Sequence, residues 1–71
     1  MDKKTLKFAV FLIHALAEDW GRSYKYVYQV LNETGILDSY ILSYYDVLHT
    51  QGEQYLVEDI TEFVKEKGVS V

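Results

Sequence analysis

Apolar residues recur along this chain at steps of three and four, and glycines interrupt the pattern at fairly regular intervals. The four glycines are Gly21, Gly35, Gly52 and Gly68. Because glycine adopts the left-handed conformation that ends a helix at little steric cost, each stretch before a glycine is expected to be helical. The pattern therefore predicts an all-α fold, a compact bundle of four short helices that forms a single helical domain over residues 1–71.

The first predicted helix extends from about Lys4 to Trp20 and is apolar on two sides. Phe11 belongs to the second side and falls between Lys7 and His14, where water would be expected. The stripe expected to face the core has helical spacing and consists of Leu6, Val10, Ile13, Ala17 and Trp20. A helix that is apolar all round is either central in its fold or covered by a partner.

The other three helices have recognisable ends. Ser23 is the expected N-cap of the second helix, and Asp38 or Ser39 that of the third, because their side-chain oxygens can accept from unpaired backbone N–H groups. The fourth helix is expected to end at Lys67 and Gly68. The positions expected to face the core are Tyr24, Val27, Tyr28 and Leu31, then Ile41, Tyr44, Tyr45 and Leu48, then Leu56, Val57, Ile60, Phe63 and Val64.

A competing interpretation places short strands at residues 55–57 and 69–71, which would turn the carboxyl-terminal half into a winged module. The helical pattern over residues 56–64 continues through the first of these segments without a break. The helical interpretation is therefore favoured.

The charge balance limits the partners that the chain can bind. Seven Lys and Arg stand against eleven Asp and Glu, giving a formal net charge of -4. Binding to nucleic acid or to anionic lipid needs a cationic excess, so neither partner is expected. The apolar run over residues 8–13 is also far shorter than the roughly 20 residues of a membrane span. The absence of cysteine excludes disulfides and thiolate metal sites, and we expect a cytoplasmic protein without a cofactor.

The most distinctive segment runs through Asp46, His49, Thr50 and Gln51. Asp46 and His49 are three residues apart, so on a helix the carboxylate could hold one imidazole nitrogen and leave the other as a base or a metal ligand. We favour the alternative in which His49 stands in the last helical turn, where a partly positive ring is stabilised, and Asp46 is solvated. No further ligand or nucleophile is suitably spaced, so we predict no enzyme, no catalytic residue and no metal site.

Seven tyrosines suggest an interface, because tyrosine combines a large apolar ring with a hydroxyl that still needs a partner. Tyr26 and Tyr40 fall outside the stripes that are expected to face the core. Together with Phe11 they are the predicted partner-facing residues. The chain carries more apolar surface than four short helices can bury, so we expect a protein partner, with a homodimer as one form of it.

The second and third helices can also be interpreted as a helix-turn-helix. Its second helix would need cations for phosphates and donors for base edges. No Lys or Arg occurs over residues 36–52, and Asp38 and Asp46 carry the wrong sign for phosphate. An atypical DNA-binding regulator is therefore the alternative function.

Three runs carry a resemblance to a known family: GILDxYI at residues 35–41, YDVLHTQG at residues 45–52 and YLVxDI at residues 55–60. They resemble a family of short uncharacterised bacterial proteins classed as a domain of unknown function. The resemblance implies an association, since members look to be encoded beside proteins similar to ADP-ribosyltransferase toxins. The predicted function is thus a small acidic protein-interaction module, accessory to or neutralising such a toxin.

Overall fold

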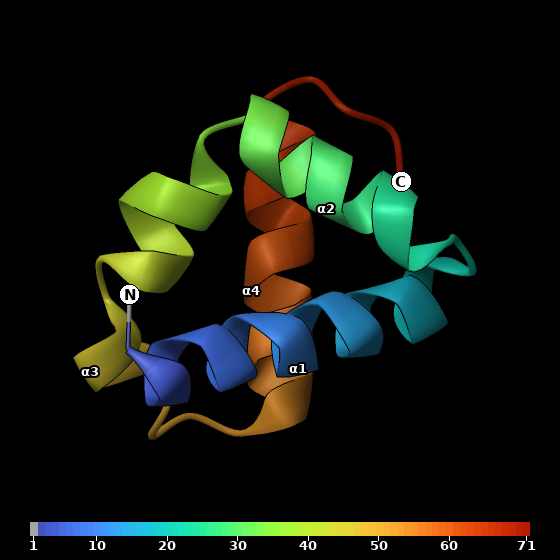
Figure 1. The fold of residues 1–71 in the computed structure, drawn as a ribbon. Helices are drawn as coiled ribbons and strands as arrows, with labels where there is room; N and C mark the ends of the chain where they lie inside the picture. The colour runs from blue at the N-terminus through green and yellow to red at the C-terminus, as the bar shows by residue number, and fades with distance from the viewer. Residues whose placement is uncertain (1) are drawn as a thin grey trace.

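Five helical segments follow one another in the computed structural model, which describes residues 2–71 (Figure 1). They are α1 (Lys3–Trp20), α2 (Tyr24–Glu33), the π-helix η1 (Leu37–Leu42), α3 (Tyr45–Leu48) and α4 (Glu53–Glu66). No strand occurs within residues 2–71, which confirms the all-α prediction. Residues 55–57 lie inside α4 and residues 69–71 are irregular, so the strand interpretation is wrong.

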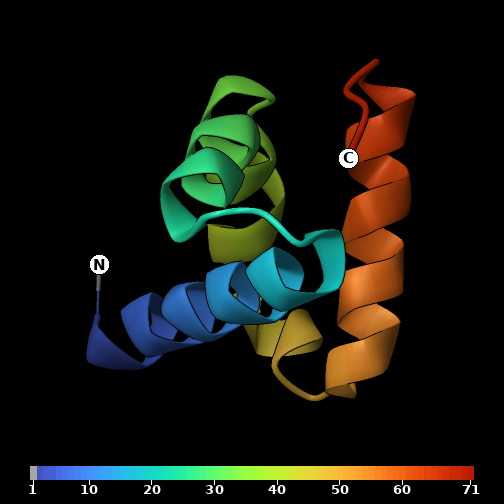
Figure 2. The same ribbon diagram turned by 90° about the vertical axis from the view of Figure 1, so that its right-hand side faces the viewer.

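The long helix α1 lies at the centre of the packing. It contacts α4, α2 and η1, with α4 crossing it steeply behind and α2 and η1 lying above it (Figures 1 and 2). The indole Nε1 of Trp20 donates to Thr61 Oγ1 at 2.9 Å and so joins the end of α1 to α4. The buried core draws on every element and comprises Ala9, Leu12, Ala15, Leu16, Ala17, Val27, Val30, Leu31, Ile36, Ile41, Leu48, Leu56, Val57, Ile60 and Val64.

The glycine stops are confirmed at three of four positions. Gly21, Gly35 and Gly68 have φ of 66°, 79° and 90° at the ends of α1, α2 and α4. Gly52 differs, because its φ of -71° and ψ of 154° are extended and it is the N-cap residue that precedes α4. The expected cap at Ser23 is confirmed, since its Oγ accepts from the backbone N–H of Tyr26 at 3.1 Å.

The third predicted helix is wrong as a single element. It divides into η1 and α3, with Tyr44 leaving helical geometry between them at φ -109° and ψ 26°. Ile36 and Ile41 are both fully buried. On an α-helix, two residues five positions apart point in directions that differ by roughly 140°, so only one of them could face the core. The wider π turn, which pairs residues five apart, aligns them toward the core. Ser43 Oγ donates across the same spacing to the carbonyl of Asp38 at 2.7 Å.

The inward stripe of α1 is also different from the prediction. Ala17 is buried and Ile13 and Trp20 are half-buried, as predicted, but Leu6 and Val10 are exposed. The buried residues of α1 are Ala9, Leu12, Ala15, Leu16 and Ala17. The buried side of α1 combines two large leucines with three alanines, and the alanines let neighbouring helices approach closely. Among the predicted inward tyrosines, Tyr24, Tyr28 and Tyr44 are exposed, while the inward stripe of α4 is confirmed with Phe63 half-buried.

Candidate protein-binding surface

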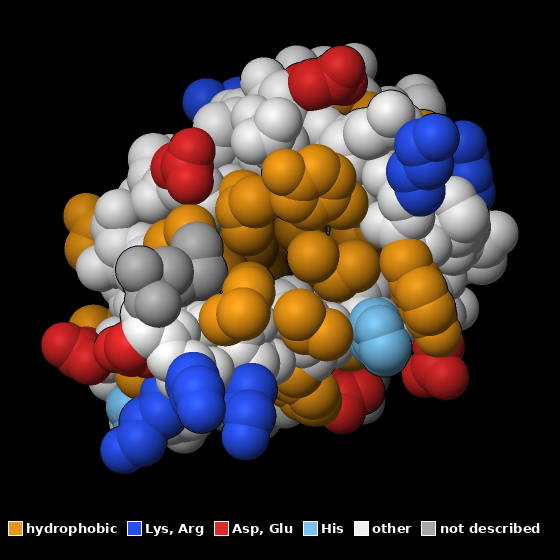
Figure 3. Space-filling view, in the orientation of Figure 1, with side chains coloured by type: hydrophobic (Ala, Val, Ile, Leu, Met, Phe, Trp, Pro, Cys, Tyr) orange, Lys and Arg blue, Asp and Glu red, His pale blue; other side chains and the backbone are white. Residues whose placement is uncertain are grey.

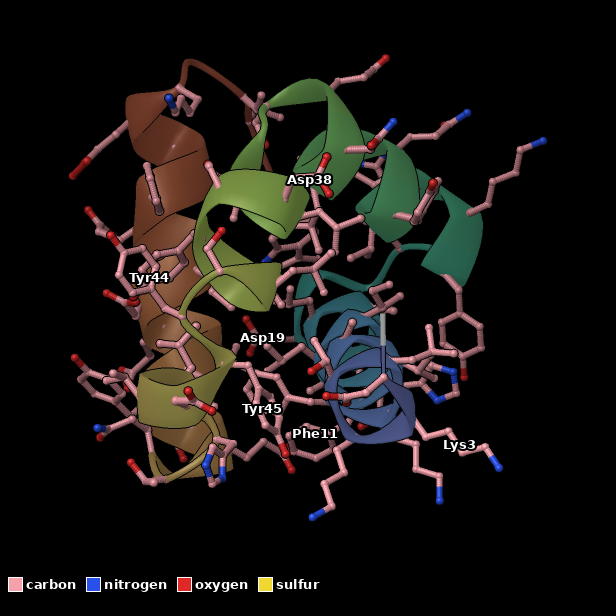
Figure 4. The ribbon with its side chains drawn as sticks, turned by 60° about the vertical axis from the view of Figure 1, so that its left-hand side comes forward. Lys3, Phe11, Asp19, Asp38, Tyr44 and Tyr45 are labelled. Atoms are coloured by element: carbon pink, nitrogen blue, oxygen red, sulfur yellow. The ribbon has the colours of Figure 1, made fainter. Side chains whose placement is uncertain are left out.

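Phe11 is exposed, as the sequence predicts. Its side chain is 43% accessible, and its ring centroid lies 6.5 Å from that of Phe8. Phe8 in turn packs edge-on against Tyr45 at 5.4 Å. Figure 4 shows Phe11 and Tyr45 on the same side of the molecule, at the junction of α1 and α3. Phe11 therefore belongs to a small aromatic cluster at this junction.

Tyr26 is half-buried and already has partners within the chain. The guanidinium carbon of Arg22 lies 3.6 Å from the centre of its ring, a cation–π arrangement. Its hydroxyl donates to the carbonyl of Ser70 at 3.4 Å and so holds the carboxyl-terminal tail against α2. The structure thus uses Tyr26 to fix the tail, and it does not bring Tyr26 together with Phe11.

Tyr40 is likewise half-buried between η1 and α4. Its hydroxyl donates to Asp59 Oδ2 at 2.5 Å, and its ring packs edge-on against Phe63 with 5.3 Å between centroids. Burial raises the pKa of Tyr40 to about 12, and the hydrogen bond to Asp59 acts in the same direction. The three residues predicted to face a partner therefore pack against different neighbours and do not form one surface.

The segment from Asp46 to Gln51 forms α3 and the turn that follows it. Asp46 stands in the first turn of α3, and His49 directly follows the last, with its ring stacked on Tyr45 at 4.6 Å. The hydroxyl of Thr50 donates to the carbonyl of Val47 at 2.7 Å, and the backbone N–H of Gln51 donates to Leu48 at 3.0 Å. His49 thus occupies the helix end, as the favoured interpretation places it.

A polar hollow opens beside this segment. Asp46 and His49 line it together with Asp2, Lys4 and Thr5 from the start of the chain. The backbone N–H of Thr5 donates to Asp2 at 2.8 Å and lowers the pKa of that carboxyl. Within residues 2–71 no three His, Asp or Glu side chains converge as metal ligands would.

A second surface is formed by four side chains that the sequence patterns assigned to the interior. Leu6 and Val10 of α1 are 52% and 44% exposed, and Tyr24 and Tyr28 of α2 are 56% and 48% exposed. Each pair is four residues apart, so its members stand one above the other on their helix. We call these four residues the apolar face.

The two halves of the apolar face are joined by an aromatic stack. His14, one turn beyond Val10, lies parallel to the ring of Tyr24 with 4.1 Å between centroids and 7° between planes. Figure 3 shows apolar side chains gathered around a hollow over α1 and α2, with a histidine against an apolar side chain at one edge. One signal in the sequence points to this surface: Leu6 and Val10 lie on the same side of α1 as Lys3 and Lys7, which belong in water.

The comparison with protein families identifies the chain. Residues 7–67 match the family described as "Protein of unknown function (DUF3791)". The chain belongs to this family. The resemblance to a family of unknown function is thereby confirmed, and the DUF3791 match includes Val10, Tyr24 and Tyr28 of the apolar face. Neither the comparison with curated proteins nor that with solved structures gave a match. Over residues 2–71, no helix has both the length and the apolar character needed to cross a membrane.

Proposed function

We propose that this protein is a binding module for another protein, which it engages through the apolar face. The observation that carries the proposal is that the core is already closed without these four side chains. Leu12, Leu16, Leu31, Ile41 and Ile60 are among the residues with no or almost no exposure behind it. Neighbouring large apolar side chains that a closed core leaves in water are typical of interaction sites.

The exposed area of the apolar face limits the affinity that can be expected for a partner. Two half-exposed tyrosines offer roughly 150–250 Å² together, and half of a leucine and half of a valine add roughly 60–120 Å². Covering this area stabilises a complex by about 5–9 kcal/mol before the cost of association, which is of comparable size. The face alone therefore supports moderate affinity, and polar contacts around it must contribute the rest.

The test introduces the same substitution, valine to aspartate, at one exposed valine on the apolar face and at another outside it. The purified protein is immobilised and used to capture partners from its native cells, as wild type, as Val10→Asp and as Val47→Asp. Val47 is a matched control, because it is 58% exposed and lies on α3, outside the apolar face. We expect Val10→Asp to lose the captured partner and Val47→Asp to keep it. The free energies of unfolding of both variants should lie within about 0.5 kcal/mol of the wild-type value, as is usual for surface substitutions.

Two outcomes would contradict the proposal. Retention of the same partner by Val10→Asp would show that the apolar face is not the binding site. Loss on Val47→Asp alone would move the site to α3 and the segment around Asp46. If the captured protein is similar to an ADP-ribosyltransferase toxin, the neutralising role implied by the family resemblance is supported.

The DNA-binding alternative draws less support from the geometry. The segment that would enter the major groove is the π-helix η1 followed by four residues of α3, and residues 36–52 offer no Lys or Arg to phosphate. A gel-shift assay at low salt tests it, since electrostatic binding is then strongest.

A further inference from the structure

Resting on the proposed function, we infer that the occupant of the apolar face is an acidic amphipathic helix of another protein. The distribution of charge is the first argument. Residues 2–25, which include α1 and the start of α2, carry five cations against three carboxylates. Residues 26–71 carry two cations against eight carboxylates. Five of the seven cations of this acidic chain thus lie in the part that carries Leu6, Val10 and Tyr24 of the apolar face.

Three lysines form a basic rim at this surface. Lys3 and Lys7 precede Leu6 and Val10 by three residues each, so they stand beside them on α1. Lys25 precedes Tyr28 by the same step on α2. All three lysines are exposed, and Figure 3 shows the cations at two edges of the apolar region, below and to the upper right of it. A partner that covers the apolar face must therefore bring carboxylates to the rim or leave lysines facing apolar or cationic groups.

Three other charged residues of this region, Glu18, Asp19 and Arg22, lie toward the end of α1 or just beyond it. Glu18 and Asp19 line a separate hollow toward α4, together with Glu53 and Glu58. Arg22 is stacked on the ring of Tyr26. Lys7 precedes Glu18 by eleven residues, about 16 Å along the helix, so Glu18 and Asp19 do not pair with the rim lysines of α1.

A second copy of this chain fits the face poorly. In a two-fold dimer the same patch meets itself, so the three lysines of one subunit would approach those of the other. The acidic helix α4 has its apolar stripe buried, and Tyr55 is the exposed large apolar residue that it presents. Neither arrangement offers both apolar anchors and carboxylates, whereas an amphipathic helix with acidic flanks offers both.

The dimensions also suit a single helix. The 18 residues of α1 extend for roughly 27 Å, close to the longest dimension of the molecule at 29 Å. A partner helix that lies along α1 and α2 would insert side chains at steps of three, four and seven residues into the hollow between them. The basic rim at the edges of the hollow would then face the polar flanks of that helix.

The experiment selects helices on the wild-type protein from a displayed peptide library. Each peptide has about 18 residues, apolar anchors at helical spacing, and Glu, Gln or Lys drawn equally at the other positions. We expect selection to enrich Glu over Lys, and the selected peptides to lose binding to Val10→Asp. Reversal of all three rim lysines to Glu should weaken binding roughly tenfold, and added salt should weaken it as well.

The control is Lys65→Glu, the same charge reversal at an exposed lysine of α4 away from the rim. It should leave peptide binding within about twofold of wild type. Unfolding midpoints of all variants verify that each one folds. Enrichment of Gln or Lys, failure to select any peptide, or equal loss on Lys65→Glu would overturn the acidic-helix inference. So would self-association of the wild type, seen by sedimentation, that Val10→Asp abolishes.

The two proposals fail in distinguishable ways. If Val10→Asp loses the native partner but selection favours neutral or basic helices, the binding module stands and its acidic occupant is wrong. If Val10→Asp keeps the native partner, the binding module itself is wrong.

Discussion

Replacing Tyr40 with phenylalanine should separate the contribution of one hydrogen bond from that of the ring that carries it. The hydroxyl of Tyr40 donates to Asp59, and this bond joins η1 to α4. Phenylalanine keeps the edge-on contact with Phe63 and removes only the donor. The substitution therefore tests whether the polar contact helps to hold the π-helix against the rest of the fold.

The expected magnitude follows from the partners of the bond. A hydrogen bond to a charged group contributes about 1.5–3 kcal/mol when its partner would otherwise be left unsatisfied. Asp59 is only half-buried, so water can replace part of what is lost. We expect Tyr40→Phe to lower the free energy of unfolding by about 1–2 kcal/mol. In a domain of this size the melting temperature should fall by about 5–15 °C.

The pH dependence supplies an independent check. The pKa of Tyr40 is raised to about 12, so the folded state holds the phenolic proton more tightly than the unfolded state, whose tyrosine pKa is about 10. The resulting stabilisation is complete below about pH 10 and is lost as the pH rises toward 12. The stability difference between wild type and Tyr40→Phe should therefore be constant near neutral pH and shrink between about pH 10 and 12.

Urea unfolding followed by circular dichroism measures both effects. The control is Tyr28→Phe, which removes a hydroxyl from an exposed ring on α2 and should change stability by less than about 0.5 kcal/mol. Equal unfolding midpoints for the two variants at neutral pH would refute the argument. A difference between wild type and Tyr40→Phe that stays unchanged up to about pH 12 would also refute it.

Two further pairs of variants test the fold by chemical or thermal unfolding. Gly35→Ala should lower the free energy of unfolding by about 1 kcal/mol, because alanine is strained at φ 79°. Gly52→Ser should raise it by about 0.5–1 kcal/mol, because φ is -71° and serine can cap α4. Equal effects of the two substitutions would contradict this assignment. Ile41→Ala should lower the free energy of unfolding by about 2–4 kcal/mol, as truncation of a fully buried isoleucine does. Deletion of the exposed Ser39 should lower the free energy of unfolding by less than Ile41→Ala does, because it shortens the π turn to an α turn and leaves Ile36 and Ile41 facing the core. A larger loss than that of Ile41→Ala would show that the π turn itself is needed.

The sequence predicts the elements of this fold better than their faces. Three glycine stops and the cap at Ser23 depend on local backbone chemistry, and they are confirmed. The π turn could not be predicted from local pattern, because its reason is the joint burial of Ile36 and Ile41 in a core that other elements complete.

The candidate site was partly missed for a related reason. Phe11 is exposed as predicted, but Tyr26 and Tyr40 are held by contacts with Ser70 and Asp59, far along the chain. Such contacts leave no periodic signal. Tyr24 and Tyr28 have the spacing of an inward stripe, and whether that stripe is covered depends on which neighbour lies over it.

The choice of face on α1 connects the fold to the proposed function. A helix with apolar residues on two sides can bury both only if enough other elements surround it, and 71 residues supply few. The side of α1 that carries Leu12 and Leu16 is buried, and Leu6 and Val10 are left in water. Mutating either residue to a polar one would give a more soluble monomer at little cost to folding. The proposed acidic helix would cover both these large apolar side chains and the three lysines beside them.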